Sequence, residues 1–282
     1  MNAATTKDPA TDPARGDRER LNEVLLASDP TDGLWIALED GLLQRAIPEI
    51  PALQMEQDPV HRHKDVLTHS IVVTAKTSAS LRLRLAALFH DVGKPATRRY
   101  RSGKVTFYHH EAVGERMTIA RLTALGYEPA MVADVGRLVG LSGRFHGYQH
   151  GWEDSAVRRY ARDAGHLLGD LNELVRCDCT TRHASKVAAL QQRVDDLEVR
   201  IRALAVEEER AKERPDLDGA AVMALLGVAG GPIVGQALRM LLEHRRTHGA
   251  MERVEAEALL TAWWVEQSGA GRVTGENDAA SR

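Results

Sequence analysis

The sequence predicts an all-α fold, and three observations support that prediction. Alanine and leucine dominate over β-branched runs, while aromatic residues make up only 4% of the chain. Apolar residues recur at spacings of three and four, as on one face of a helix, and strand-type alternation is almost absent. Prolines and glycines fall between many of these segments, where they mark helix ends.

The elements can be justified in chain order. Asp29-Pro30 separates a helix expected over 18–27 from one over 31–45, and Pro48 and Pro51 then end this first unit. A second pair of apolar helices follows, and Gly93 and Pro95 end the second helix of this pair. We expect further helices over 111–125, 129–141, 155–164 and 166–179, with a short exposed connection over 98–108. Residues 219–238 are apolar but interrupted by glycines and a proline, which predicts two short helices joined by a turn and no membrane span.

A seam of apolar residues predicts one long helix after position 184. The seam residues are Val187, Leu190, Val194, Leu197, Ile201 and Leu204. They alternate spacings of three and four, so the helix packs along the body of the protein or forms a dimer seam. The oligomeric state stays open. We expect five segments: a disordered lead (1–17), a neck-like N-terminal helical unit (18–60), a histidine-rich metal-binding domain (61–183), a C-terminal helical body (184–268) and a disordered tail (269–282).

Composition excludes several classes of protein. The chain has 282 residues, 43% hydrophobic and 27% charged, as expected for one or two ordinary globular domains. Its net charge of −3 excludes a global basic field for nucleic acid, so any such binding needs a local patch. Cys177 and Cys179 are the two cysteines, too few for a secreted disulfide framework. The N-terminus lacks the apolar core of a signal peptide, so we expect a cytoplasmic protein.

Histidines cluster in one third of the chain, which indicates a metal site. Eight of the 12 histidines lie between positions 61 and 150: His61, His63, His69, His90, His109, His110, His146 and His150. Adjacent residues on a helix point about 100° apart, so His90 and Asp91 converge on one ion only where a helix ends, as Gly93 and Pro95 indicate. A second helix presenting His69 and a third presenting Asp178 would complete a shell of nitrogen and oxygen ligands. His61 and His63 line the entrance or lie in a turn.

The order of these residues resembles the HD superfamily of metal-dependent phosphohydrolases. The resembling residues are His69, His90-Asp91 within Leu-Phe-His-Asp-Val-Gly-Lys, His110, His146 and Asp178. The segments HDVGKPATR (90–98), FYHHEAVG (107–114), RFHGY (144–148) and DSAVRRYARDAG (154–165) further resemble the body of actinobacterial CCA-adding tRNA nucleotidyltransferases, of the poly(A) polymerase-like family, over about residues 18–265. Members of that family begin with a nucleotidyltransferase head, and because 17 residues precede the matching region here we expect this head to be absent. The resemblance therefore implies an HD-domain helical bundle without nucleotide addition.

The resemblance also implies roles for individual residues. His69, His90, Asp91 and Asp178 would hold a first divalent ion (Fe, Mn, Co, Ni, Zn or Mg), and His110 and His146 a second ion that Asp91 bridges. The expected catalytic residues are Asp91, Lys94, His110 and Glu111. Lys94 and Arg98 would neutralise phosphoryl charge. Glu111 relays a proton or merely begins a helix.

Substrate contacts are expected from arginines near this centre. Arg158, Arg159 and Arg162 recur at helical spacing, and Arg182 follows Asp178. With His183 they form a basic wall for phosphates, or the three on the helix form a solvated face, and Arg98 is a further expected substrate contact. We expect hydrolysis of a phosphate ester in a nucleotide or an RNA 3′ end, with tRNA as a possible partner. The alternatives are a non-catalytic RNA-binding body, acting alone or with a separate nucleotidyltransferase head, and a di-iron oxygenase.

Overall fold

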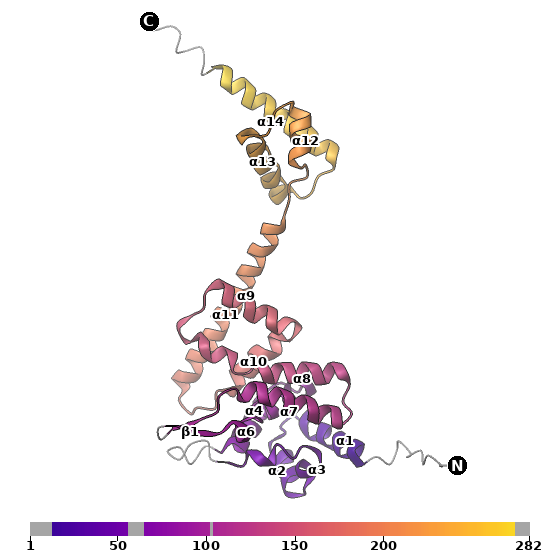
Figure 1. The fold of residues 1–282 in the computed structure, drawn as a ribbon, viewed down its shortest axis with the longest axis vertical. Coiled ribbons are helices and arrows are strands. Elements are labelled where there is room, and N and C mark those ends of the chain that lie inside the picture. Colours follow the sequence, from indigo (N-terminus) through magenta and orange to yellow (C-terminus); the bar gives the residue numbers. More distant parts are fainter. Residues whose placement is uncertain (1–12, 56–64, 102–103, 274–282) are drawn as a thin grey trace, which may run out of the picture. The chain divides into compact units, whose positions relative to one another are not determined.

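The protein is all-α, as the computed structural model shows for residues 13–55, 65–101 and 104–273 (Figure 1). The chain divides into two compact units, Met1–Leu204 and Ala205–Arg282. The N-terminal unit contains helices α1 (Pro13–Leu26), α2 (Thr31–Glu39), α3 (Leu42–Ala46), α4 (Val66–Lys76), α5 (Leu81–Phe89), α6 (Lys94–Thr97), α7 (His110–Ala124), α8 (Pro129–Leu141), α9 (Asp154–Ala164), α10 (Leu168–Asp178) and most of α11 (Ala184–Lys212). Short 3₁₀ turns lie at η2 (Pro51–Leu53), η3 (Arg144–His150) and η4 (Gly165–Leu167).

Helix α5 is the centre of the N-terminal unit. It contacts α4, α8, α1 and α10, and its residues from Leu83 to Phe89 are all buried. Apart from Arg82 and Arg84, α5 is apolar on every side, as expected for a helix inside a core. The helix ends at Phe89, so the next residues, His90 and Asp91, are held at the middle of the unit.

A buried arginine on α5 fixes the end of α1. Arg84 is 2% exposed, and its guanidinium donates to the carbonyl oxygens of Leu25 and Ala27 and, at 3.3 Å, to that of Ser28. Leu25 lies in the last turn of α1, and Ala27 and Ser28 follow that turn, where backbone carbonyls lack the partner that a continuing helix would provide. Arg84 therefore joins the N-terminal helices to the core.

Gly93 permits a close backbone approach beside the expected metal ligands. A Cβ at this position would lie 2.8 Å from the backbone nitrogen of Gly114 and closer still to the carbonyl oxygen of His110. Both obstructing atoms are backbone atoms of α7, which cannot rotate away as a side chain would. The turn after His90-Asp91 thus packs directly on α7.

Local structure differs from expectation at several points, one being that the last helix, Arg253–Val273, extends into the segment 269–282 expected to be a disordered tail. The connection over 98–108 contains a hairpin of β1 (Arg99–Arg101) and β2 (Lys104–Thr106), antiparallel with Tyr100 opposite Val105. The helix expected over 31–45 is broken at Gly41, whose φ of 80° is left-handed, and the Asp40 carboxylate accepts from the backbone of Leu42 to begin α3. Helix α1 begins at Pro13, inside the segment 1–17 that was expected to be disordered.

The C-terminal unit has a small core of its own. It contains α12 (Gly219–Leu226), α13 (Pro232–His248) and α14 (Arg253–Val273), packed around residues such as Val222, Leu241 and Leu260. The expected pair of helices within 219–238 is confirmed: Asp218 caps α12 and Gly227 ends it with a φ of 65°. Across the described part of the chain, every helix is too short or too polar to cross a membrane.

The apolar seam of α11 packs on the N-terminal unit. Val194, Leu197 and Leu204 are buried in the main core, with Leu190 and Ile201 packed against it. The seam therefore belongs to a long helix lying along the body. The division at Leu204 falls within α11, inside the segment 184–268 expected to form a C-terminal body.

Candidate metal centre

An open, polar cavity of about 1130 Å³ lies at the end of α5. It is lined by Asp65, Thr68, His69, Val72, His90, Asp91, Lys94, His110, Ser142, Gly143, His146, Asp178, Thr180, Thr181, Arg182, His183 and Lys186. All six residues expected to ligate metal line this one cavity. The convergence predicted from the histidine pattern is thus present in the fold.

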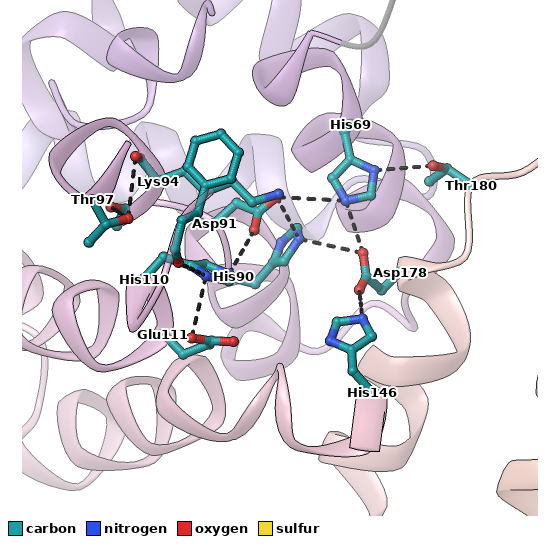
Figure 2. A network of polar contacts seen from close by, with 12 residues as sticks. His69, His90, Asp91, Lys94, Thr97, His110, Glu111, His146, Asp178 and Thr180 are labelled. Carbon is teal, nitrogen blue, oxygen red and sulfur yellow. Dashed lines mark hydrogen bonds and ion pairs between the residues drawn. The ribbon is translucent and has the colours of Figure 1, made fainter. Parts of the chain in front are cut away.

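Three of these residues form a compact ligand cluster (Figure 2). His69 comes from α4, His90 follows α5, and Asp178 is the last residue of α10, a helix that contacts both α4 and α5. His69 Nε2 lies 2.9 Å and His90 Nε2 3.6 Å from Asp178 Oδ1. One donor atom of each residue lies within 4.8 Å of the others. Such spacing suits donors that share an ion at about 2.0–2.2 Å.

Asp91 lies between this cluster and His110. Its Oδ2 is 3.2 Å from His90 Nε2 and 3.8 Å from His69 Nε2, whereas its Oδ1 is 3.5 Å from His110 Nε2. Lys94 Nζ is 2.7 Å from the same Oδ2, and Asp91 is only 2% exposed. The two carboxylate oxygens therefore face different imidazoles, Oδ2 those of His90 and His69 and Oδ1 that of His110, as a bridging ligand requires.

Backbone carbonyls orient two of the imidazole rings. His90 Nδ1 lies 2.7 Å from the carbonyl oxygen of Ala87, and His110 Nδ1 lies 2.9 Å from that of Phe107. A carbonyl only accepts, so each Nδ1 carries the proton and donates it. The unprotonated Nε2 of a neutral ring then points into the cavity, which is the arrangement typical of metal-ligating histidines.

The electrostatics of the centre favour a cation. Burial opposes ionisation of Asp178, but the hydrogen bond from His69 and the charge of His90 lower its pKa to about 2. Burial likewise opposes the charged form of Asp91, yet the charge of His90 and the bond from His110 hold its pKa well below the usual value. Burial lowers the pKa of His90, but the neighbouring carboxylates outweigh it and raise that pKa to about 9. The site therefore keeps two ionised carboxylates and stabilises positive charge between them.

The residues expected to hold a second ion are separated in this structure. His110 faces Asp91, and its Nδ1 also lies 3.3 Å from Glu111 Oε2. His146, on η3, faces Asp178 instead, with its Nε2 4.0 Å from Asp178 Oδ2 and its side chain 72% exposed. Within the described residues, the donor cluster consists of His69, His90 and Asp178. The second ion stays a prediction.

The arginines expected to contact substrate lie in different places. Arg182 lines the cavity, and Arg98 lies over the ring of Tyr100 at 5.2 Å from its centroid. The three on α9 lie outside the lining of the cavity: Arg158, Arg159 and Arg162. That helix buries Val157 and Tyr160. Its arginines occupy other faces, with Arg159 and Arg162 exposed, and His61 and His63 lie outside the described residues.

Several cavity residues were not predicted from the sequence, and two of them, Thr180 and Lys186, bear on the chemistry of the site. Thr180 Oγ1 lies 3.1 Å from His69 Nδ1 and so orients the third ring, and Lys186 brings a second cation to the cavity wall beside Arg182. Both lie in or just after the connection from α10 to α11. Their proximity in sequence to Asp178 was the signal that could have found them.

Comparisons with known proteins agree with this geometry. The HD domain family model matches residues 66–205, a range that includes every proposed ligand. An A-adding tRNA nucleotidyltransferase of Deinococcus radiodurans is 32% identical over 259 residues, covering 89% of this chain and 59% of the relative. A CC-adding tRNA nucleotidyltransferase of Thermus thermophilus is 35% identical over 255 residues, covering 87% and 56%. The chain thus spans less than two thirds of the length of these relatives. The chain contains an HD domain over residues 66–205, and His69, His90 and Asp178 lie within it.

Proposed function

We propose that the protein is a metal-dependent phosphohydrolase acting on a nucleotide or an RNA terminus. The observation that carries this proposal is the convergence of His69, His90, Asp91 and Asp178 at one polar cavity. A nitrogen and oxygen donor set of this kind fits Fe, Mn, Co, Ni or Zn, and its carboxylates are also compatible with Mg. The cavity is open, so a substrate can reach the ligands from solvent.

The reaction would be hydrolysis at phosphorus. A bound divalent ion supplies Lewis acidity at the phosphoryl oxygens and makes water a better nucleophile. The water oxygen forms a bond to phosphorus while the ester P–O bond breaks, and the leaving oxygen retains that electron pair and takes up a proton. With one ion bound, His110 accepts the proton of water at Nε2, and Glu111, 3.3 Å from Nδ1, stabilises the resulting charge.

Cations of the chain would offset the charge of the phosphoryl group. Lys94 is buried beside Asp91, and Arg182 and Lys186 lie on the cavity wall. Positive groups that the protein holds where negative charge develops stabilise the transition state more strongly than the same groups would in bulk water. These three residues are therefore the proposed phosphate contacts of the site.

The experiment combines metal analysis with phosphate release. Purified protein is assayed for bound metal and for turnover of 2′,3′-cyclic, 2′-, 3′- and 5′-nucleotides, beside Asp178→Asn and a control, Asp196→Asn. Asp196 is exposed on α11. Within the described residues, its carboxylate accepts one hydrogen bond, from the side chain of Gln192. Asp178→Asn should lose metal and at least ~100-fold in turnover, while the control keeps both. Undiminished hydrolysis in Asp178→Asn would overturn the proposal.

Nucleotide addition is not expected from the described residues. The sequence contains an Asp-x-Asp pair, but Asp216 is paired with Arg245, and Asp218 caps α12 by accepting from the backbone of Ala221. Both carboxylates are thus engaged in structure. Incubation with tRNA and labelled ATP or CTP should give no extension, and extension would contradict this part of the proposal.

The similarity to tRNA enzymes favours a second candidate, a tRNA-binding body without catalysis. Both relatives are named as tRNA nucleotidyltransferases, and their similarity covers most of this chain. This candidate predicts tRNA binding that survives removal of metal by a chelator. Binding of tRNA with no phosphate release from any nucleotide would favour it over hydrolysis.

A further inference from the structure

Two histidines near the end of α13 form a stacked pair in the C-terminal unit. His244 and His248 are four residues apart, so their side chains lie one above the other on the same side of the helix. Their ring centroids are 4.2 Å apart, and the two ring planes differ by 20°. His248 is exposed and His244 is half-buried. Both rings can therefore be reached from solvent, and neither lines the cavity of the metal centre.

A backbone carbonyl orients the ring of His248. Its Nδ1 lies 3.2 Å from the carbonyl oxygen of His244. A carbonyl only accepts, so Nδ1 carries the proton, and Nε2 of the neutral ring keeps a free lone pair. Contacts of the same kind orient His90 and His110, at 2.7 and 2.9 Å from their carbonyl oxygens. His248 is thus held in the form in which an imidazole binds a metal ion.

The charges around the pair permit a bound cation. The two residues that follow His244 are arginines, and each has a carboxylate partner. Arg245 pairs with Asp216, and Arg246 Nε lies 2.9 Å from Glu213 Oε2. Their positive charges are therefore offset locally. The histidines also lie in the last turns of α13, where the negative end of the helix dipole favours a cation.

The donor set of the pair differs from that of the metal centre. An ion that takes two imidazole nitrogens at about 2.0 Å in a tetrahedral shell needs them roughly 3.3 Å apart. Rings stacked at 4.2 Å reach this spacing by a small tilt. Among the described residues, the one group of three or more His, Cys, Asp or Glu donors is that of His69, His90 and Asp178. The pair therefore offers two nitrogens and no carboxylate, which suits Zn²⁺, Ni²⁺ or Cu²⁺ and disfavours Mn²⁺ and Mg²⁺.

We propose that His244 and His248 form a separate metal site that binds Zn²⁺, Ni²⁺ or Cu²⁺ at the end of α13, with water completing the shell. The inference does not depend on the proposed hydrolysis. A bound ion joins two successive turns of the helix and so holds its last turns closed. Within the described residues, the buried core of the C-terminal unit has seven hydrophobic members. A structural ion therefore adds stability to a unit whose own core is small.

The test is a titration of Ni²⁺ into protein that carries Asp178→Asn, which disables the metal centre of the HD domain. Adding His244→Ala or His248→Ala should lower the apparent Ni²⁺ affinity of the α13 site at least ~10-fold, because one imidazole alone cannot chelate the ion. Mn²⁺ binding should be the same with and without these changes in otherwise wild-type protein. Hydrogen exchange locates the effect: Ni²⁺ should slow exchange of the amides over 241–248, and His248→Ala should abolish that slowing.

The matched control keeps the number of histidines and changes their spacing. In the His248→Ala protein, Arg246→His places the second imidazole about 200° around the helix from His244, so it should not restore Ni²⁺ binding. Thr247→His in the same protein places it three residues away on the same side, and should restore much of the affinity. Ni²⁺ binding that is equal with and without the two histidines, or that Arg246→His restores as well as Thr247→His, would overturn the site.

Discussion

Metal should bind this centre more tightly as the pH rises from 7 to 9, because the ion must displace a proton from His90. The neighbouring carboxylates raise the pKa of His90 to about 9 in the metal-free protein. At pH 7 the ring is therefore protonated in all but about 1% of molecules, and the apparent affinity is about 100-fold below its limit. At pH 8 the reduction is about tenfold, and near pH 9 it is about twofold.

The sign of the effect follows from the direction of the shift. Because the folded pKa lies above the ordinary value of 6.5, the charged His90 ring stabilises the metal-free protein below pH 6.5. This stabilisation is lost as the pH rises through about 9. The pKa of Asp178 is lowered to about 2, so this carboxylate is ionised throughout and adds nothing to the slope. Protonation of His90 and binding of metal thus compete for the same nitrogen.

Isothermal titration with Mn²⁺ in two buffers of different ionisation enthalpy measures the effect directly. About one proton should be released per ion between pH 7 and pH 8, falling to about half near pH 9. Asp91→Asn is the diagnostic variant, because it removes the carboxylate that most raises the pKa of His90. In this variant, the pH range over which metal affinity rises steeply should move to lower pH. An affinity that is flat from pH 7 to pH 9, with no proton released, would refute the reasoning.

Two further predictions concern the support of the centre. Gly93→Ala should cost about 3 kcal/mol of unfolding free energy, because its Cβ meets backbone atoms of α7, and should weaken metal binding by moving His110. Gly169→Ala, where a Cβ meets nothing within 4 Å, is the control, and equal melting temperatures for the two variants would contradict the prediction. Arg84→Met should also cost about 3 kcal/mol, because it leaves buried carbonyls at the end of α1 without donors. Thermal unfolding should show a decrease in Tm of about 6–12 °C, and a change below ~1 °C would be inconsistent with this account.

Much of the helical fold could be predicted because its signals are local. The cap at Asp65 and the stop at Gly93 bracket the ligand helices, and Asp218 caps α12 in the same local way. The hairpin at β1 and β2 could not be predicted, because each strand has three residues and shows no alternation to detect. The break at Gly41 was missed because helix propensity is summed over many residues, whereas a single residue with a left-handed backbone is enough to end a helix.

The candidate site was predictable where a motif links residue type to position. His90 and Asp91 lie at a helix end, and Asp178 reaches them from α10, as the resemblance implied. The arginines of α9 show the limit of such reasoning. Helical spacing places Arg158 and Arg162 on one side of a helix, but which side faces the cavity depends on how Val157 and Tyr160 pack.

The position of Asp178 has a consequence for the whole HD domain. His69 and Asp178 lie about a hundred residues apart in sequence yet 2.9 Å apart in space. A cation held by both would act as a removable cross-link, closing a long chain loop in the way a disulfide does without needing oxidation. Withdrawing the ion would then loosen the contact between α4 and α10, so metal supply would govern the resistance of the domain to proteases as well as its chemistry.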